Sequence, residues 1–238
     1  KGDFGTMELK KGILYGVGVG PGDPELLTMK AVRVLRHCPV VAAPQTKSGE
    51  TLALDIVRQA LPLDGKAVLP LYFSMERDKA LIRAAHEKAA DAIQVHLDAG
   101  EDVAMLNLGD VSIYATWGYV MDLVRKRGYE TVMIPGVPSF CAAASRLGTT
   151  LVSWGSPLQV IPVGKSPLEP QLERLGAKVL MKAGSRLPEL VDALKRTGQL
   201  ERAVLAENCG LPDERICGDL SKCPDDVGYF ATVIVKEK

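Results

Sequence analysis

The sequence predicts an α/β protein of two α/β domains, the first with a mostly parallel sheet and helices, the second with a mixed sheet. Three observations favour this fold. Short apolar runs, typical of strands buried on both faces, alternate with helical patterns through the first half. A stretch rich in small residues, proline and glycine then interrupts the pattern near the middle of the chain. Finally, residues 215–235 contain no long helix between strand signals, which favours antiparallel pairing.

The elements of the first half follow from apolar spacing and from turn residues. Asp23 is the predicted N-cap of the first helix, with Pro24 at its first position, where a missing N–H costs nothing. Leu27, Ala31 and Val34 then form one apolar helical stripe. In chain order we predict strands at 13–19, 40–43, 66–71, 103–108 and 131–134, and helices at 23–38, 51–61, 76–99 and 114–127.

The domain boundary is predicted where small residues and prolines gather. Residues 1–6 precede Met7 and resemble a cloning remnant, so they are left out of the fold prediction. The N-terminal domain is expected at 7–137, a linker at 138–157 and the C-terminal domain at 158–238. Within the second domain we predict strands at 158–163, 178–181, 203–206 and 231–236, and helices at 168–175 and 186–197.

Composition disfavours two classes of partner. Of 238 residues, 29 are Lys or Arg and 29 are Asp or Glu, so the chain lacks the basic excess of a nucleic-acid-binding protein. No apolar run reaches the ~18 residues that a membrane-spanning helix needs, and no signal peptide is evident. We therefore expect a cytoplasmic protein that binds neither nucleic acid nor membrane.

The sequence shows no metal-binding pattern. The five cysteines are odd in number and form no C-x-x-C pair, so we expect free thiols rather than a disulfide framework or a zinc site. His86 and His96 are ten residues apart on one predicted helix and cannot share a metal. His96 continues an apolar stripe of that helix and is expected to pack against a neighbour.

The first glycine loop, residues 16–23, does not fit a nicotinamide site. A G-x-G-x-x-G fingerprint needs a glycine five positions after the first, but Pro21 follows Gly16 by five and Asp23 follows Gly18 by five. The acidic residue expected about 20 positions on is also missing, as is the G-K-[ST] of a P-loop. A nicotinamide-dependent reductase is therefore disfavoured. The loop remains either a tight strand-to-helix turn or a bare backbone edge for a flat ligand.

Two further glycine loops, 107–114 and 135–140, follow predicted strands. In open α/β sheets, ligands bind at the carboxyl ends of the strands. Three glycine-bearing loops that leave three strand ends are expected to form one crevice.

These loops resemble the ordered signature of the tetrapyrrole methylase family. The matching segments are Gly18-Val19-Gly20-Pro21-Gly22-Asp23 with Leu26-Leu27-Thr28, then Gly109-Asp110, then Pro135-Gly136-Val137. The family consists of S-adenosylmethionine-dependent enzymes of two α/β domains. Segments 109–117 and 135–144 further resemble the members that methylate carbon 20 of precorrin-2 or cobalt-factor II in cobalamin biosynthesis. The resemblance covers residues 13–235.

The resemblance implies a cofactor cleft between the domains, with S-adenosylmethionine bound there, S-adenosylhomocysteine as product and no protein-bound metal. On the N-terminal side it implies cofactor contacts from Pro21, Leu108, Gly109, Asp110, Ile113, Pro138 and Ser139. For the adenosine it implies contacts from Lys182, Ala183, Asn208, Cys209, Ala231 and Thr232. Many relatives have proline at position 111, methionine at 182 and glycine at 209, so backbone contacts are the safer expectation at Lys182 and Cys209.

The implied reaction needs no nucleophilic side chain, because the positive sulfonium already activates the methyl group. Positioning and desolvation of two bound reactants are the main tasks. The catalytic residues are therefore unknown, with Asp110 and Tyr114 as candidates for a base by position alone, although a carboxylate that bonds loop N–H groups is the favoured interpretation of Asp110. The candidates for binding substrate carboxylates are the basic residues Lys47, Arg77, Lys165 and Arg186.

Other functions remain open at this point. A uroporphyrinogen III or diphthine type of methyltransferase has a similar first loop, and a non-catalytic protein that binds S-adenosylmethionine or a tetrapyrrole has no sequence feature against it. The expected partner is a small-molecule tetrapyrrole, with or without cobalt. A homodimer is expected because the family's methylases are commonly homodimers.

Overall fold

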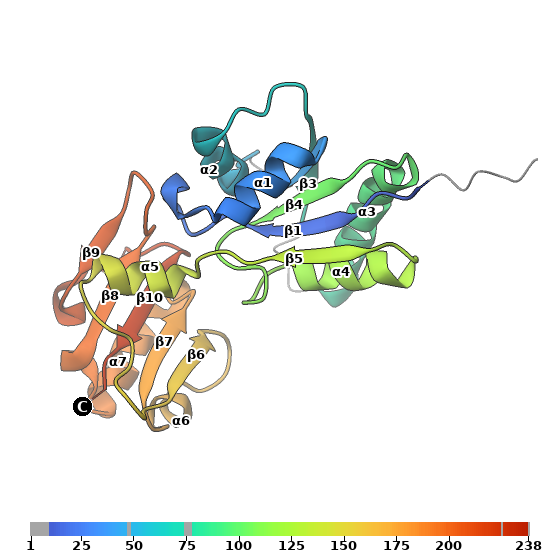
Figure 1. The fold of residues 1–238 in the computed structure, drawn as a ribbon. Helices are drawn as coiled ribbons and strands as arrows, with labels where there is room; N and C mark the ends of the chain where they lie inside the picture. Colours follow the sequence, from blue (N-terminus) through green and yellow to red (C-terminus); the bar gives the residue numbers. More distant parts are fainter. Residues whose placement is uncertain (1–9, 47–48, 74–77, 225, 238) are drawn as a thin grey trace, which may run out of the picture. The chain divides into compact units, whose positions relative to one another are not determined.

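The computed structural model describes residues 10–46, 49–73, 78–224 and 226–237. The chain divides into two compact units, residues 1–137 and 138–238; Figure 1 colours the described part of the first from blue to yellow-green and that of the second from yellow to red. Each unit has its own five-stranded sheet and its own buried core. The prediction of two α/β domains is confirmed, and each domain is described by itself below.

The N-terminal sheet is entirely parallel, in the order β3-β2-β4-β1-β5. Its strands are β1 (Leu14–Gly18), β2 (Val40–Gln45), β3 (Ala67–Tyr72), β4 (Val103–Asn107) and β5 (Thr131–Ile134). Its helices are α1 (Met29–His37), α2 (Leu52–Ala60), α3 (Lys79–Asp98) and α4 (Trp117–Lys126), with a 3₁₀ turn η1 at Pro24–Leu26. Because β1 pairs with both β4 and β5, the three strands that are followed by glycine loops are adjacent in the sheet.

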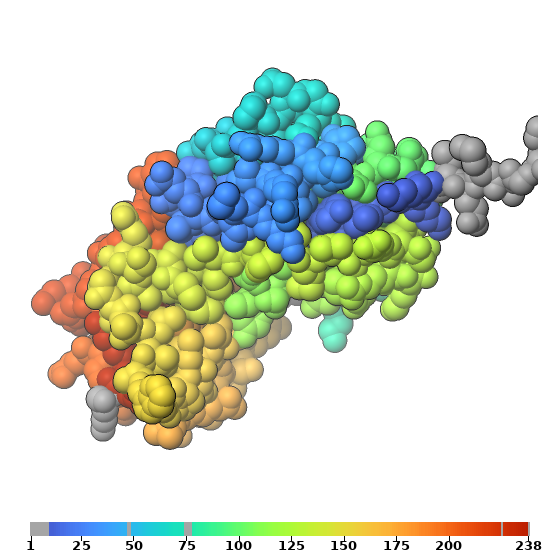
Figure 2. Space-filling view, in the orientation of Figure 1, coloured from blue at the N-terminus to red at the C-terminus, as the bar shows by residue number. Residues whose placement is uncertain are grey.

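Helices cover both faces of this sheet, which explains why the strands have apolar residues on both sides. Val41 packs with α1 and α2 on one face, whereas its neighbour Val40 packs with α3 and α4 on the other. In Figure 2 the atoms of α1 and α2, blue to teal, form a continuous surface over one of these faces. On the opposite face a Cβ at Gly16 would lie 2.4 Å from the Trp117 ring, so only glycine leaves room for this buried side chain.

The C-terminal sheet is mixed, in the order β6-β7-β10-β8-β9, with only β6 and β7 parallel. Its strands are β6 (Leu158–Pro162), β7 (Ala177–Met181), β8 (Ala203–Glu207), β9 (Arg215–Cys217) and β10 (Ala231–Val235). Its helices are α5 (Ser139–Arg146), α6 (Glu169–Leu172) and α7 (Leu187–Arg196), with 3₁₀ turns η2 (Gly184–Arg186), η3 (Leu200–Arg202) and η4 (Leu220–Lys222). The predicted antiparallel arrangement of residues 215–235 is confirmed.

Two of the differences from the predicted boundaries concern the first helix and the expected linker. The helix expected from residue 23 is interrupted, because Asp23 caps only η1, Leu27 is extended, and Thr28 caps α1 by accepting from the N–H of Ala31. The segment 138–157, expected as a linker, begins with α5, which packs against β8 and β10.

The cysteines and histidines correct two expectations. Cys217 and Cys223 form a disulfide, because η4 turns the chain back beside β9 and brings their Cα atoms to 6.0 Å. His86, rather than His96, is the buried histidine of α3, stacked on Tyr119 with the ring centroids 4.8 Å apart. Burial lowers the pKa of His86. His96 instead lies 2.7 Å from the Glu101 carboxylate. Within the described ranges, no helix combines the length and apolarity that crossing a bilayer requires.

Candidate functional site

The three glycine loops of the N-terminal domain lie together at the carboxyl edge of its sheet, as predicted. Gly20 and Gly109 form an isolated β-bridge, with Gly109 N–H donating to the Gly20 carbonyl at 2.8 Å. A Cβ at Gly136 would lie 2.2 Å from the Gly109 carbonyl oxygen, and a Cβ at Gly18 would lie 2.6 Å from the Gly136 nitrogen. The loops therefore touch through their backbones, and only glycine fits at these contacts.

Asp110 holds two of these loops together. Its Oδ2 accepts from the Gly136 N–H at 2.8 Å, and its Oδ1 accepts from both the N–H (2.8 Å) and the hydroxyl of Ser112. Burial acts to raise the pKa of Asp110, but the hydrogen bonds from Ser112 and Gly136 outweigh it and keep the pKa below its ordinary value. A carboxylate that is charged and fully engaged by loop donors is suited to positioning the loop rather than to accepting a proton.

Asp110→Asn is expected to destabilise the N-terminal domain by about 1–3 kcal/mol near neutral pH, because an amide cannot accept at both ends. The folded pKa of Asp110 is lower than its ordinary 3.8, so its stabilisation is complete above that value and is lost as the pH falls through the folded pKa. Urea unfolding from pH 7 to pH 2 checks this. If the difference in the free energy of unfolding between wild type and Asp110→Asn stays constant down to pH 2, Asp110 does not have the lowered pKa described.

Tyr114, the other candidate base, stands in a strained backbone conformation in the same loop. Its φ is 50°, and about half of its side chain is exposed. This left-handed residue explains why α4 begins at Trp117 instead of the predicted 114. Around it, Leu108 and Ile113 are partly buried, while Pro21 is buried.

In the C-terminal domain, one edge of the sheet brings together all six positions expected to contact adenosine. The pairs Thr232–Met181 and Ala231–Glu207 place the start of β10 beside the ends of β7 and β8. The Ala183 N–H donates to the Ala231 carbonyl at 3.0 Å. Lys182–Ala183, Asn208–Cys209 and Ala231–Thr232 are therefore neighbours, although they are far apart in sequence.

The strained backbone conformations occur in the loops already described in the two domains. Tyr114, Lys182 (φ 60°) and Asn208 (φ 49°) are the non-glycine residues with positive φ among those described. All three lie in loops that the family resemblance implies for the cofactor. A left-handed conformation costs an L-residue roughly 1–2 kcal/mol and tends to persist where a site requires it. Strain at three such positions is an indication of function that is independent of residue type.

Lys182→Gly is expected to be more stable than Lys182→Ala by about 1 kcal/mol, because alanine keeps the strained Cβ and glycine removes it. Both variants lose the contact of the Lys182 ammonium with the Tyr229 ring, whose centroid is 5.6 Å away, so the comparison isolates the backbone. Thermal unfolding of the two variants measures the difference. Equal stabilities would show that position 182 is unstrained.

Glu207, at the end of β8, was missed by sequence reasoning. It is 3% exposed, accepts from the Gly228 N–H through Oε1, and lies 2.5 Å from Arg215 Nε through Oε2. Gly228 in turn packs closely on Gly184, since a Cβ added to Gly184 would lie 1.9 Å from the Gly228 carbonyl oxygen. Glu207 thus holds the segment before β10 beside the turn after β7. The available signal was one charged residue directly after the apolar run 203–206.

Of the four basic residues expected to bind substrate carboxylates, Lys165 and Arg186 are among the described residues, both in the C-terminal domain. Lys47 and Arg77 lie outside the described residues. Arg186 bonds within its own domain, to the Gly164 and Ser166 carbonyls and to Glu189 Oε2 at 2.7 Å. Lys165 is exposed in the adjoining loop. Across the described ranges, no group of three or more His, Cys, Asp or Glu side chains is arranged to hold a metal ion.

Comparison with known proteins places these features in a family context. Residues 13–223 match the family model described as tetrapyrrole (corrin/porphyrin) methylases. The chain is 31% identical to the cobalt-precorrin-2 C(20)-methyltransferase of Salmonella typhimurium over 95% of this chain and 97% of that protein. It is 33% identical to the precorrin-2 C(20)-methyltransferase of a Sinorhizobium species, over 94% and 95% of the two chains.

Solved structures of similar fold agree with this match. A cobalt precorrin-4 methyltransferase has a TM-score of 0.75 at 22% identity and covers 94% of each chain. The uroporphyrin-III C-methyltransferase from Thermus thermophilus, complexed with S-adenosylhomocysteine, has a TM-score of 0.69 at 23% identity, over 94% of this chain and 92% of that one. At these identities the likeness establishes the fold.

Proposed function

The chain belongs to the tetrapyrrole methylase family, and we propose on that basis that it transfers the methyl group of S-adenosylmethionine to carbon 20 of a precorrin-2-type tetrapyrrole in cobalamin biosynthesis. The observation that supports this most is the near-complete coverage of two relatives whose names state carbon-20 methylation. The resemblance of segments 109–117 and 135–144 to the same members agrees with it.

The residues present fit S-adenosylmethionine. The Gly18–Gly109–Gly136 backbone contacts hold three loops together at the carboxyl edge of the sheet, which is where ligands bind in open α/β sheets. Leu108, Gly109, Asp110 and Ile113 are proposed to hold the methionine end, with Pro21, Pro138 and Ser139 beside them. Lys182, Ala183, Asn208, Cys209, Ala231 and Thr232 are proposed to hold the adenosine.

The proposed chemistry depends on position rather than on a nucleophilic side chain. S-adenosylmethionine supplies a methyl group bonded to a positively charged sulfur. The leaving group is the neutral thioether S-adenosylhomocysteine, which needs no further activation. Asp110 positions its loop through Gly136 and Ser112, and the left-handed residues Lys182 and Asn208 turn the backbone after β7 and β8. Orientation and exclusion of water then supply the acceleration. A proton on the methylated carbon would be removed afterwards, and Tyr114 stands in a suitable loop for this step.

The test is a turnover assay with methyl-labelled S-adenosylmethionine, run in parallel on cobalt-factor II and metal-free precorrin-2. We expect one new label at carbon 20, located by NMR. The faster substrate decides whether cobalt is inserted before or after this step, which the two relatives leave open because their names differ on this point. Label at another carbon would overturn the carbon-20 proposal within the family. Binding of S-adenosylhomocysteine without turnover on either substrate would indicate another methyl acceptor or a binding protein.

We also propose that the enzyme acts as a cytoplasmic homodimer. Light scattering at micromolar concentration is expected to give twice the monomer mass of 25.6 kDa. A monomeric mass with full turnover would contradict the dimer.

A further inference from the structure

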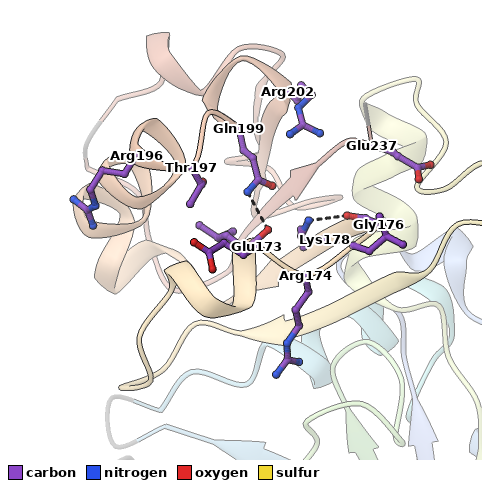
Figure 3. Close-up of a pocket in the computed structure, with 11 residues that line it drawn as sticks. Glu173, Arg174, Gly176, Lys178, Arg196, Thr197, Gln199, Arg202 and Glu237 are labelled. Atoms are coloured by element: carbon purple, nitrogen blue, oxygen red, sulfur yellow. Dashed lines mark hydrogen bonds between the residues drawn. The ribbon is translucent and has the colours of Figure 1, made fainter.

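A cavity of the C-terminal domain lies at the opposite edge of its sheet from the proposed adenosine positions. It encloses about 520 Å³ and is drawn in Figure 3. Its wall includes Lys178 at the start of β7, Gln199 after α7, and Arg202 before β8. Lys178 lies near the start of β7 and Lys182 directly follows the end of β7, four residues on, so the two edges are separated by about 13 Å. The volume falls in the range of small-molecule sites.

Lys178 is a buried cation that forms no ion pair with the residues described. It is 5% exposed, and its Nζ donates to the Gly176 carbonyl at 2.8 Å. Lysines are almost never fully buried unless they are paired, because desolvation of the charge is costly. An anion in the cavity would supply the missing partner.

Arg202 adds a second positive charge to the same space. One of its guanidinium nitrogens donates to the Lys236 carbonyl at 2.9 Å, which fixes the side chain against β10's end. Burial and then the nearby Arg202 lower the pKa of Lys178, whereas Glu237 acts in the opposite direction. Glu237 already accepts hydrogen bonds from Ser153 and Ser156. The lining holds four cationic side chains, Arg174, Lys178, Arg196 and Arg202, against the carboxylates of Glu173 and Glu237, so the cavity has an excess of positive charge.

Gln199 adds a buried acceptor to which none of the described residues donates. It is 5% exposed, and its Nε2 donates to the Leu172 carbonyl at 2.9 Å, which sets the orientation of the amide. Its Oε1 has no hydrogen-bond partner among the described residues. Figure 3 shows this amide and the Lys178 ammonium directed toward the same space. A buried acceptor of this kind costs stability until a donor reaches it.

We propose that this cavity is a binding site for a small oxyanion that also has a hydroxyl group, with the oxyanion on Lys178 and Arg202 and the hydroxyl donating to Gln199 Oε1. The oxyanion is a phosphate or a carboxylate group. The site is independent of the proposed methyl transfer, since its three residues contribute nothing to the adenosine edge.

The experiment is isothermal titration of the full-length protein at pH 7 and constant ionic strength with three probes. Inorganic phosphate has an oxyanion and a P–OH donor, sulfate has the same shape without the donor, and citrate has carboxylates and a hydroxyl. We expect phosphate or citrate to bind, with sulfate several-fold weaker than phosphate. The tighter of phosphate and citrate identifies the chemical source of the oxyanion.

Three variants connect binding to the cavity. Lys178→Met keeps the volume of the side chain and removes its charge, so affinity is expected to fall about tenfold or more. Gln199→Met is expected to abolish the preference for phosphate over sulfate. Lys195→Met is the matched control, because Lys195 is an exposed lysine on α7 that pairs with Asp192, and it is expected to leave affinity unchanged.

An NMR readout separates binding from folding. With ¹⁵N-labelled lysine, the pKa of Lys178 is expected to rise when the ligand is present, because an anion stabilises the charged form. The proposal is overturned if none of the probes binds below 10 mM as an order-of-magnitude limit for a specific site. It is also overturned if Lys178→Met binds as tightly as Lys195→Met.

Discussion

Gly136→Ala is expected to destabilise the N-terminal domain by about 3 kcal/mol, at the upper end of overpacking costs. The added Cβ would lie 2.2 Å from the Gly109 carbonyl oxygen and 2.8 Å from the Gly18 carbonyl carbon. Both are backbone atoms that β-pairing holds in place, so neither moves without breaking hydrogen bonds of the sheet. The same displacement would pull the Gly136 N–H from Asp110. We therefore also expect affinity for S-adenosylhomocysteine to fall at least tenfold.

Gly118→Ala is the matched control for this substitution. Gly118 lies inside α4, and a Cβ there would meet nothing within 4 Å. Alanine at this position is expected to stabilise the domain by about 0.5–1 kcal/mol, because it reduces the freedom of the unfolded chain. Urea unfolding and calorimetric titration with S-adenosylhomocysteine measure both effects. Similar stabilities for the two variants would show that the loops are not in tight backbone contact.

Arg215→Met is expected to destabilise the C-terminal domain by about 2–4 kcal/mol, which is more than the loss from Glu207→Gln. The Glu207 carboxylate is 3% exposed and has two partners, the Arg215 guanidinium and the Gly228 N–H. Removing the guanidinium leaves it with the Gly228 N–H alone. An uncompensated buried charge costs several kcal/mol. Arg215 is itself 38% exposed, so water replaces part of the interaction that Arg215 loses when Glu207 is changed, and Glu207→Gln is therefore expected to cost less.

The double variant Glu207→Gln/Arg215→Met provides the decisive comparison. With the charge gone, the amide of the glutamine still accepts from Gly228, so the double variant is expected to be more stable than Arg215→Met alone. Denaturant unfolding of the four proteins completes the cycle. If the double variant is the least stable of the four, the carboxylate is not buried in the way described. Affinity for S-adenosylhomocysteine is expected to follow the same order, because Glu207 positions the segment before β10.

Local sequence patterns were sufficient for the two domains, the parallel sheet and the glycine loops. The apolar run 13–19 predicts a strand covered on both faces, since period and composition depend only on neighbouring residues. Glycine at 18, 109 and 136 predicts close backbone approach at strand ends for the same reason. The positions implied for the cofactor came from the resemblance of ordered motifs to the tetrapyrrole methylase family.

Long-range pairing was decided only by the folded chain. Asp110 bonds Gly136, 26 residues away, and Glu207 bonds Gly228, 21 residues away, and no local period connects such residues. The Cys217–Cys223 disulfide depended on the turn at η4. The odd number of cysteines had argued against a disulfide framework and gave no sign of this one pair. His86 was buried instead of His96 because α3 packs against α4 on the face that contains residue 86, and an apolar stripe alone did not identify that face. Burial and partners are properties of the tertiary contacts, so the buried charges at Lys178 and Glu207 became visible only with the structure.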